Sequence, residues 1–568
     1  MKKQILISLC VTLCLLFALS SCSAFCKHEY AERVVPSTCV AEGYTEYTCT
    51  KCGESYKENF QPVIQHYFLG GPCTVCGMQE ITESITPSTE WYNSETEMFT
   101  LTTKEELAGL AALVNSGTSF ANKTVYLGAD IDLGYYEWIP IGNADNAFAG
   151  KFDADGHTIS SLKINAQSNY AGLFGNSKGQ ILNLNVNNAS IFSSRYYKYI
   201  SIVCGYTTHE MTNVTARGFI DAAKADYVGA IAGATSPGEI IYSKLINHAA
   251  VKGANYVGGI IGEVNTGSIV QTDKLTNMGD VTGTSHVGGI FGYTNAKAGS
   301  SIYNAASNAN IVGDYYVGGI VGKAVNVGIS HCSNEGSTIT ANSYFAEGSN
   351  FYVWLGGYAG YGYSVEDCTN NASIMYSSRG AYVGGIIGYA TNTMRNCTNN
   401  ASITSYANDV GGIAGHIELV WSENAYRNLT NNGNVSGKDN VGGIVGNAYR
   451  SIRDSGLTPV SKMNTVYNNA NVTGENCVGG LFGLLNCDNT AWYQGYSINI
   501  FDAGNAGTIS GVTKCGEIFG SFWSAGDSNL TNYTVTGKIV INNEPLEGEY
   551  DVGSQERLTL ADRKVAGK

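Results

Sequence analysis

A glycine-rich phrase that returns about every 30 residues limits what this chain can fold into. The stretch NYVGGIIGEV at 255–264 is followed by HVGGIFG, YVGGIVG, YVGGIIG, DVGGIAG, NVGGIVG and CVGGLFG. Alignment on the residue before the paired glycines gives Val228, Val257, Val287, Val317, Leu355, Val383, Val410, Val441 and Val478, with weaker copies at Ala171, Ile200 and Cys515. Such a period indicates one supersecondary unit per repeat.

The second half of each repeat consists of short apolar segments broken by Asn and Gly, as in LTNNGNVSG and VYNNANVTG. Strands this short cannot bury their apolar face within one unit, so the units must stack. We expect the glycines to supply positive φ and close backbone approach at corners, and the asparagines to form ladders between stacked turns. The sequence therefore predicts an all-β parallel β-helix of some twelve turns, roughly 60 Å long at about 4.8 Å per turn.

The phrase VGGIxG, followed by xxNCxNxGxVxG, resembles the GLUG repeat of bacterial surface proteins, including some immunoglobulin A1-type peptidases. The segment FTLTTKEELAGLAALVNSG, with the residues after it, resembles the usual start of such arrays. The resemblance covers about 99–540. It implies a right-handed parallel β-helix on the outside of a bacterium, but no single activity. The zinc HExxH motif of the peptidase members is missing, because His28–Glu29 and His209–Glu210 lack the second histidine.

The open end of a β-helix needs a cap. TKEELAGLAALVNSG at 103–117 predicts a short capping helix, because Thr103 and Glu106 form a capping-box pattern and Gly117 stops the helix. Leu107, Leu110, Ala111 and Val114 would form its apolar face. We expect the segment that leads into the array at 91–165, the repeats at 166–540, and a terminal strand pair or tail at 541–568.

The N-terminus predicts export. Lys2 and Lys3 precede an apolar run that is too short for a comfortable membrane span. The end of this run, LSSC, resembles the bacterial lipobox, so 1–21 is predicted to be a signal peptide and Cys22 the lipid attachment site. The alternative is ordinary cleavage after Ala24. We expect a lipid-anchored protein at the bacterial cell surface, and the net charge of -14 argues against nucleic acid as a partner.

The segment 22–90 contains a Cys/His module. Its candidate metal ligands are Cys26, His28, Cys39, Cys49, Cys52, His66, Cys73 and Cys76. Two CxxC pairs followed by Gly have the spacing of zinc knuckles, and GYTEYTCTKCG resembles a short repeat of gut bacterial secreted proteins. We expect two structural zinc sites, one with His28, Cys39, Cys49 and Cys52, the other with Cys26, His66, Cys73 and Cys76. The alternative is a disulfide-stapled module.

We interpret two further groups of potentially reactive residues as structural. Asp130, Asp132, Asp153, Asp155 and His157 could hold calcium or act as bases, but we interpret them as turn residues. The later cysteines are odd in number, and Cys332, Cys368 and Cys397 share one repeat position, which predicts a column of buried thiols.

The repeat period breaks at 38 residues between Val317 and Leu355. We expect surface loops here and in a later segment, because insertions on repeat scaffolds usually lie on the surface. The candidate ligand-binding aromatics are Tyr344, Phe351, Tyr352, Trp354, Trp492 and Tyr493. Their rings could stack on sugars, or they could cover the apolar side of the rod.

These features together predict a non-enzymatic, adhesin-like surface protein that binds glycan or host surface ligands. The alternatives are a polysaccharide lyase or hydrolase on a β-helix and a purely structural envelope spacer. Few charged residues lie in 200–540, which argues against an enzyme.

Overall fold

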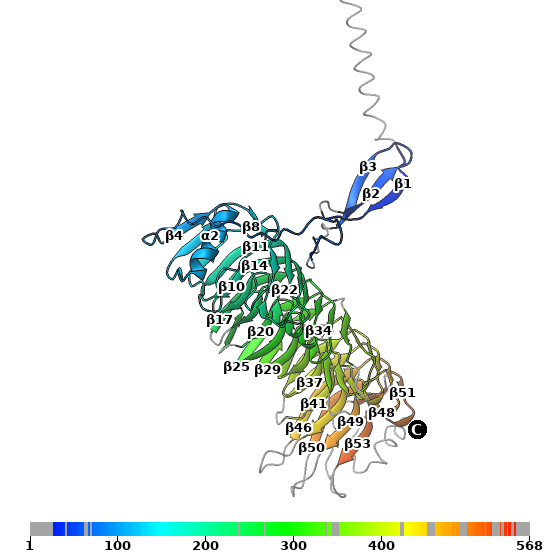
Figure 1. Ribbon diagram of the computed structural model, residues 1–568. Helices are drawn as coiled ribbons and strands as arrows, with labels where there is room; N and C mark the ends of the chain where they lie inside the picture. Colours follow the sequence, from blue (N-terminus) through cyan, green and yellow to red (C-terminus); the bar gives the residue numbers. More distant parts are fainter. Residues whose placement is uncertain are drawn as a thin grey trace, which may run out of the picture. The chain divides into compact units, whose positions relative to one another are not determined.

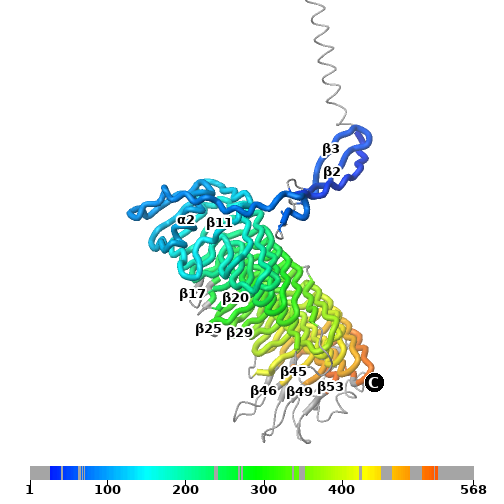
Figure 2. The backbone as a smooth tube through the Cα atoms, viewed as in Figure 1, coloured from blue at the N-terminus to red at the C-terminus, as the bar shows by residue number. Residues whose placement is uncertain are grey.

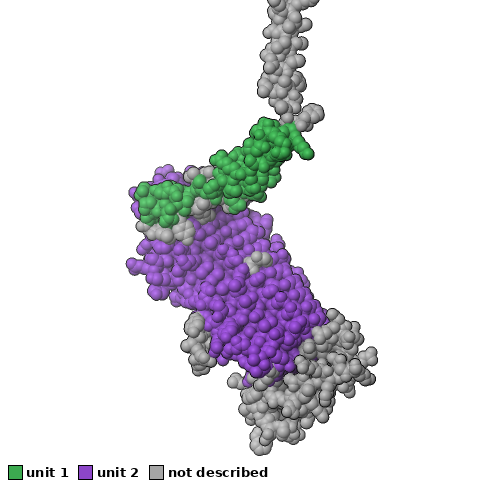
Figure 3. All heavy atoms as spheres, turned by 90° about the vertical axis from the view of Figure 1, so that its right-hand side faces the viewer, with its two compact units in different colours: residues 1–80 green, residues 81–568 purple. Residues whose placement is uncertain are grey.

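The computed structural model describes residues 26–551, with gaps at 40–42, 62–65, 67, 69–70, 236–238, 266–267, 272, 336–337, 344–351, 421–424, 451–459, 488–496, 517, 525–533, 536–538, 542–543 and 547–549. The predicted signal peptide and Cys22 therefore lie outside the described residues. The chain separates into two compact units, Met1–Glu80 and Ile81–Lys568 (Figure 3).

The first unit contains a three-stranded antiparallel sheet. Its strands are β1 (Tyr30–Val35), β2 (Gly43–Cys49) and β3 (Ser55–Gln61), in the order β1-β2-β3. β1 is exposed along almost its whole length. The sheet alone therefore buries too little apolar surface to form a substantial core.

The second unit is an all-β parallel β-helix, which confirms the predicted fold class (Figures 1 and 2). One of its sheets contains a strand from each of eleven successive turns. These strands are β12 (Lys198–Ile200), β15 (Asp226–Gly229), β19 (Asn255–Gly258), β24 (Ser285–Gly288), β28 (Val317–Gly318), β32 (Val353–Gly356), β36 (Ala381–Gly384), β40 (Asp409–Gly411), β44 (Asp439–Gly442), β48 (Asn476–Gly479) and β52 (Thr513–Gly516).

The register in this sheet matches the sequence alignment. Val228 lies beside Val257, Val257 beside Val287, and Val317 beside Leu355 in spite of the longer interval between them. The weaker copies follow the same register, because Ile200 pairs with Val228 and Cys515 with Val478. The valines from Val228 to Val478 and Leu355 are fully buried, so they form one interior column.

A second strand follows the glycine pair in each turn. These strands are β13 (Cys204–Thr207), β16 (Ala232–Thr235), β20 (Ile261–Val264), β25 (Phe291–Tyr303), β29 (Val321–Ser330), β33 (Ala359–Gly362), β37 (Ile387–Ala390), β41 (Ala414–Glu418), β45 (Val445–Arg450), β49 (Phe482–Cys487) and β53 (Phe519–Ser524). They belong to a larger sheet that also holds the strands completing each turn, such as β21 (Ser268–Gln271), β22 (Leu275–Asn277) and β23 (Val281–Thr282).

The repeat glycines serve close approach, and the prediction that they supply positive φ is wrong. Among the described residues, positive φ at glycine occurs only outside the repeated phrase, as at Gly117 and Gly299. A Cβ on Gly258 would lie 2.0 Å from the carbonyl oxygen of Ile261, and one on Gly262 would lie 2.6 Å from that of Tyr256. The strands on either side of the corner therefore pack backbone against backbone, which only glycine allows.

Ladders of buried asparagines hold corners of successive turns, as predicted, and lie against the second glycine of the repeated phrase. Asn370, Asn399, Asn431, Asn468 and Asn505 are buried, and each of the first four donates from Nδ2 to the Oδ1 of the next over 2.8–2.9 Å. Their strands are β34 (Ser364–Asn370), β38 (Met394–Asn399), β42 (Tyr426–Asn431), β46 (Val460–Asn468) and β50 (Ser497–Asn505). These buried amides have hydrogen-bond partners on both sides, so they can occupy an apolar interior.

The capping helix is confirmed. α2 (Lys104–Asn115) begins at the N-cap Thr103, which forms a capping box with Glu106, and its apolar face is buried. It lies between β4 (Met98–Leu101) and β5 (Thr124–Leu127), which add parallel strands ahead of β7 (Lys151–Asp153), β8 (Thr158–Ser160), β9 (Lys163–Asn165), β10 (Phe174–Ser177) and β11 (Gln180–Phe192). At the other end, β55 (Ile539–Ile541) pairs antiparallel with β56 (Glu544–Leu546), and β54 (Thr534–Val535) with β57 (Tyr550–Asp551).

Candidate metal centres and an aromatic ribbon

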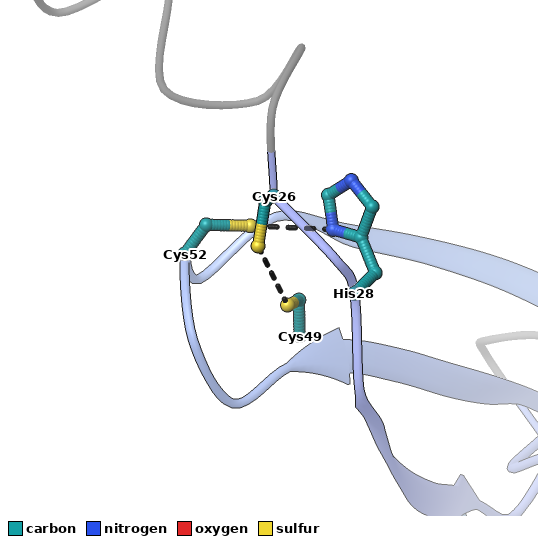
Figure 4. Close-up of side chains that lie close together, drawn as sticks. All are labelled: Cys26, His28, Cys49 and Cys52. Carbon is teal, nitrogen blue, oxygen red and sulfur yellow. Dashed lines mark hydrogen bonds between the residues drawn. The ribbon is translucent and has the colours of Figure 1, made fainter.

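The first unit brings its cysteines and histidines into two groups of four. Cys26, His28, Cys49 and Cys52 form one group (Figure 4). Cys39, His66, Cys73 and Cys76 form the other. Within each group the potential ligand atoms all lie within 4.8 Å of one another. Either group could hold a metal ion.

The predicted division of these ligands is wrong at two positions, since Cys26 and Cys39 exchange places. The reason is the antiparallel pairing of β1 with β2, in which Tyr30 lies opposite Cys49 and Val35 opposite Tyr44. Residues just before β1 therefore lie beside Cys49, whereas Cys39, which follows β1, is carried toward the other end of the hairpin.

Each CxxC pair lies in a tight turn. The Cys49 carbonyl accepts from Gly53 N at 2.9 Å, and the Cys73 carbonyl accepts from Gly77 N at 2.8 Å. Gly53 and Gly77 have φ of 79° and 74°, which favours glycine after the second cysteine. The turn presents both sulfurs of a pair to the same point.

The distances match tetrahedral coordination in both groups. Cys26 Sγ lies 3.8 Å from Cys49 Sγ, and Cys39 Sγ lies 3.9 Å from Cys73 Sγ. A disulfide needs about 2.05 Å, whereas two thiolates each about 2.3 Å from a tetrahedral zinc ion are separated by about 3.8 Å. His28 Nδ1 lies 3.4 Å from Cys52 Sγ, and His66 Nδ1 lies 3.2 Å from Cys76 Sγ. The eight cysteine and histidine residues are thus spaced as metal ligands, and these cysteines are free thiols.

The first group has an uneven electrostatic environment. Burial acts to raise the pKa of Cys49, but the backbone amides of Lys51 and Cys52 outweigh it, so the pKa is lowered to about 5. Partial burial and the neighbouring thiols Cys52 and Cys49 raise the pKa of Cys26 to about 12. His28 Nε2 lies 3.6 Å from a carboxylate oxygen of Glu54, which orients the ring with Nδ1 toward the cysteines.

The predicted ligand-binding aromatics are divided between described and undescribed residues. Tyr344, Phe351, Trp492 and Tyr493 lie outside the described residues. Tyr352 is 39% exposed, and its ring stacks on Tyr382 with centroids 5.0 Å apart. Trp354 lies within β32 rather than in a loop, and its ring stacks on Tyr316 at 4.3 Å.

Trp354 belongs to a longer feature, which we call the aromatic ribbon. Its first row contains the residue before each repeat valine: Tyr170, Tyr199, Tyr227, Tyr256, His286, Tyr316, Trp354 and Tyr382. Successive ring centroids in this row lie 4.3–5.1 Å apart up to Trp354, and Tyr382 follows at 6.2 Å. From Tyr199 to Trp354 the rings are stacked, so each covers the face of its neighbour along the solenoid axis.

The second row of the ribbon comes from the strand after the glycines, seven residues later in each turn. It contains Tyr206, Ala234, Glu263, Tyr293, Lys323, Tyr361, Tyr389 and His416, which are register neighbours. Rings of the two rows meet edge to face, as in Tyr199–Tyr206 at 5.2 Å and Tyr382–Tyr389 at 5.4 Å. The close packing at the glycines brings the two rows together.

Sequence reasoning missed this ribbon, although a signal was present. The alignment fixed the interior valines, and an aromatic residue precedes most of them from Ala171 to Val383. An outward-pointing position that is aromatic in successive repeats predicts a stacked column. Five first-row residues, from Tyr170 to His286, have φ of 56–68°, which is unusual for bulky side chains.

The ribbon ends in buried polar groups. Asp409 follows Tyr382 in the first row, and His416 ends the second row. Burial raises the pKa of Asp409 to about 6, although the amides of Asn440 and Asn447 act to lower it. Burial lowers the pKa of His416 to about 4.

The acidic cluster of 130–157 is engaged in hydrogen bonds, and its local ones, from Gly134 N to Asp132 and from Asp155 N to Asp153, agree with the turn interpretation. Asp130 Oδ1 accepts from Thr158 N at 2.8 Å and lies 3.2 Å from His157 Nδ1. Asp153 Oδ1 accepts from Asp155 N and from Asn183 Nδ2. Among the described residues, the groups whose positions fit a metal ion are the two Cys/His groups, and this acidic cluster is not among them.

The predicted column of buried cysteines is also present. Cys368 pairs with Cys397, and Cys332, Cys368 and Cys397 are all buried in the solenoid core. Burial raises the pKa of Cys397 to about 12, which keeps the thiol protonated and unreactive.

Comparison with known proteins gives one partial similarity. Halomucin of Haloquadratum walsbyi is 33% identical to the chain over 152 residues, which cover 24% of this chain and 2% of halomucin. No known family model and no solved structure matches the chain. No helix among the described residues is both long and apolar enough to pass through a bilayer.

Proposed function

We propose that the protein is a lipid-anchored, non-enzymatic scaffold on a bacterial surface that presents aromatic side chains to carbohydrate. The similarity to halomucin and the resemblance of the repeats to GLUG arrays support display on the cell surface. The lipid at Cys22 would provide the anchor, the Cys/His module a spacer, and the solenoid the display surface.

The ion in the module would be zinc, with a structural role. Each group offers three sulfurs and one imidazole nitrogen at tetrahedral spacing, which is the donor set of closed zinc sites. Four protein ligands leave no open position for a substrate. A bound ion would therefore crosslink the chain around the small sheet of β1, β2 and β3.

The single observation that carries the binding proposal is the position of Tyr352. One face of its ring stacks on Tyr382 at an interplanar angle of 13°, and 39% of the residue is exposed at the start of β32. A sugar ring can stack its C–H groups on a partly negative aromatic face. Trp354 is less suited to this role, because it is less exposed than Tyr352 and has two ring neighbours, Tyr316 at 4.3 Å and Tyr382 at 6.2 Å.

A catalytic role as a polysaccharide lyase or hydrolase has less support. The acids Asp130 and Asp153 that could act as bases already accept backbone hydrogen bonds. A solenoid with a few binding side chains needs no such base, so binding is the simpler function.

Binding of the full chain to a glycan array and to host mucin tests the proposal. Tyr352→Ala should lose most of the signal, whereas Tyr196→Ala, which removes a tyrosine that is 83% exposed, should retain it. Equal binding by both variants would remove Tyr352 from the site. No binding by the unchanged protein would favour a structural spacer in the envelope, and release of unsaturated or reducing sugar ends would favour an enzyme.

A further inference from the structure

The second row of the aromatic ribbon contains two charged residues of opposite sign. Glu263 and Lys323 both lie beside Tyr293, one turn before it and one turn after it. At about 4.8 Å per turn, their backbones are about 10 Å apart along the axis. They are too far apart to pair with each other.

Neither charge has an opposite charge within reach. In the described part of the chain, neither Glu263 nor Lys323 takes part in an ion pair or a conventional hydrogen bond. Both are half-buried, and burial raises the pKa of Glu263 and lowers that of Lys323. The Lys323 ammonium lies over two rings, 4.6 Å from the centroid of Tyr316 and 5.1 Å from that of Tyr361. Each charge would gain from a partner that also excludes water.

The surroundings have the composition of a protein interface. Aromatic residues are enriched and charges depleted in the cores of such interfaces. The first-row rings cover one another's faces, so they present mainly edges and polar tips outward, for example where Tyr227 stacks on Tyr256 at 4.8 Å and 4°. A second ribbon of edges and hydroxyl groups can pack on such a surface, whereas a sugar ring finds few free faces there.

We propose that the aromatic ribbon is the interface between two copies of this chain, antiparallel about a two-fold axis that crosses the ribbon at Tyr293. Rotation about that axis exchanges the turn before Tyr293 with the turn after it and leaves each row opposite itself. Glu263 of each copy therefore faces Lys323 of the other, and two equivalent ion pairs form, as an isologous interface requires.

The remaining charges near the ribbon are compatible with this arrangement. Lys198 and Asp226 lie three turns and two turns before the axis, on the outer side of the first row. The matching positions after the axis are those of Ala381 and Val353, which are buried and uncharged. His286 would face its own copy at the axis, and burial lowers its pKa to about 4, so the ring is neutral at neutral pH. None of these three residues meets a like charge.

Charge-reversing substitutions at Glu263 and Lys323, combined with photocrosslinking, test the proposal on the intact protein in cells. A photoreactive amino acid in place of Tyr293 should give a covalent dimer. The same residue in place of Met375, which is 49% exposed on β35 (Ser373–Tyr376), should not. In the Tyr293 background, Glu263→Lys or Lys323→Glu should reduce the dimer at least about tenfold, because each places like charges opposite one another twice.

The double exchange Glu263→Lys with Lys323→Glu should restore the dimer, because both ion pairs re-form with reversed sign. This also separates lost docking from misfolding, since two misfolding changes would not cancel. Lys274→Glu changes the net charge as Lys323→Glu does, at an exposed residue before β22, and should leave the crosslink unchanged. Absence of a dimer in the parent protein, or an equal dimer in both single variants, would overturn the proposal.

Discussion

The two units of this chain are stabilised in opposite ways. In the first unit, β1 is exposed along most of its length, and the buried cysteines Cys49 and Cys73 are themselves candidate metal ligands. In the solenoid, each turn buries its valines and isoleucines against the next, so that long columns are fully inaccessible. Stability is concentrated at two points in the first unit and spread over many similar contacts in the second.

The largest expected effect is loss of the first unit when metal is removed. Zinc binding is worth on the order of 10 kcal/mol in small domains, more than a three-stranded sheet contributes alone. A chelator should therefore unfold β1 and β2 and leave the solenoid folded. Hydrogen exchange with mass spectrometry would show full exchange at 30–49 and unchanged protection in the repeats.

Single cysteine changes provide the matched comparison. Cys49→Ser should unfold the module, whereas Cys204→Ser, at an equally buried thiol of the solenoid whose Sγ donates to the Tyr206 carbonyl, should cost only about 1–2 kcal/mol. A module that keeps its protection after Cys49→Ser would contradict the metal-dependent fold.

The next effect concerns a single turn of the solenoid. Gly258→Ala places a Cβ 2.0 Å from the Ile261 carbonyl oxygen, so the backbone must shift, at a cost of about 3 kcal/mol. Gly328→Ala is the control, because its Cβ meets first the Ser364 hydroxyl at 3.1 Å, a side chain that can rotate. In Gly258→Ala, amide hydrogen exchange should become faster around β19 and β20 and stay unchanged in distant turns. Equal costs at both glycines would contradict the close-approach argument.

Much of the fold could be predicted because repetition makes register visible. The spacing of the valines gave the pairing of Val228 with Val257, and the capping box at Thr103 gave the helix. The prediction for the repeat glycines was right about close backbone approach and wrong about positive φ, because residue type alone does not tell which of the two a glycine serves. Left-handed backbone instead occurs at residues such as Tyr227 and Asn396.

The candidate sites could be predicted only in part. Residue type identified the eight metal ligands, but their division depends on which end of β1 reaches Cys49, and that follows from the antiparallel register. The position of Trp354 in a ladder follows from the strand that precedes the glycines, not from the long interval before it. The local sequence shows which chemical groups are present, whereas the pairing of strands that are distant in the sequence decides which groups lie close together.

A smaller effect is expected at Asp409. Its pKa rises from about 3.8 when unfolded to about 6 when folded, so the folded state binds the proton more tightly. The contribution of Asp409 to stability is therefore fully present below pH 4 and is lost as the pH rises to 6. Ionisation of Asp409 therefore lowers the free energy of unfolding by up to about 3 kcal/mol at pH 7. Asp409→Asn should raise the Tm at pH 7 and not at pH 4, and a constant difference across this range would contradict the assignment.

The smallest effect is the difference in stability between variants of two neighbouring asparagines, the buried Asn399 and the exposed Asn400. Asn399 is buried, its Nδ2 donates to the Ala401 carbonyl and to Asn431 Oδ1, and its Oδ1 accepts from Ala401 N. Asn399→Ala removes these buried hydrogen bonds and should cost about 1–3 kcal/mol. Asn400 is exposed and donates to Asn371 Oδ1 at 2.9 Å, where water can replace it, so Asn400→Ala should cost about 0.5 kcal/mol or less. Denaturant unfolding of the two variants measures the difference. If the costs were equal, the buried ladder would add no more than the exposed one, and the solenoid would owe its stability to apolar columns alone.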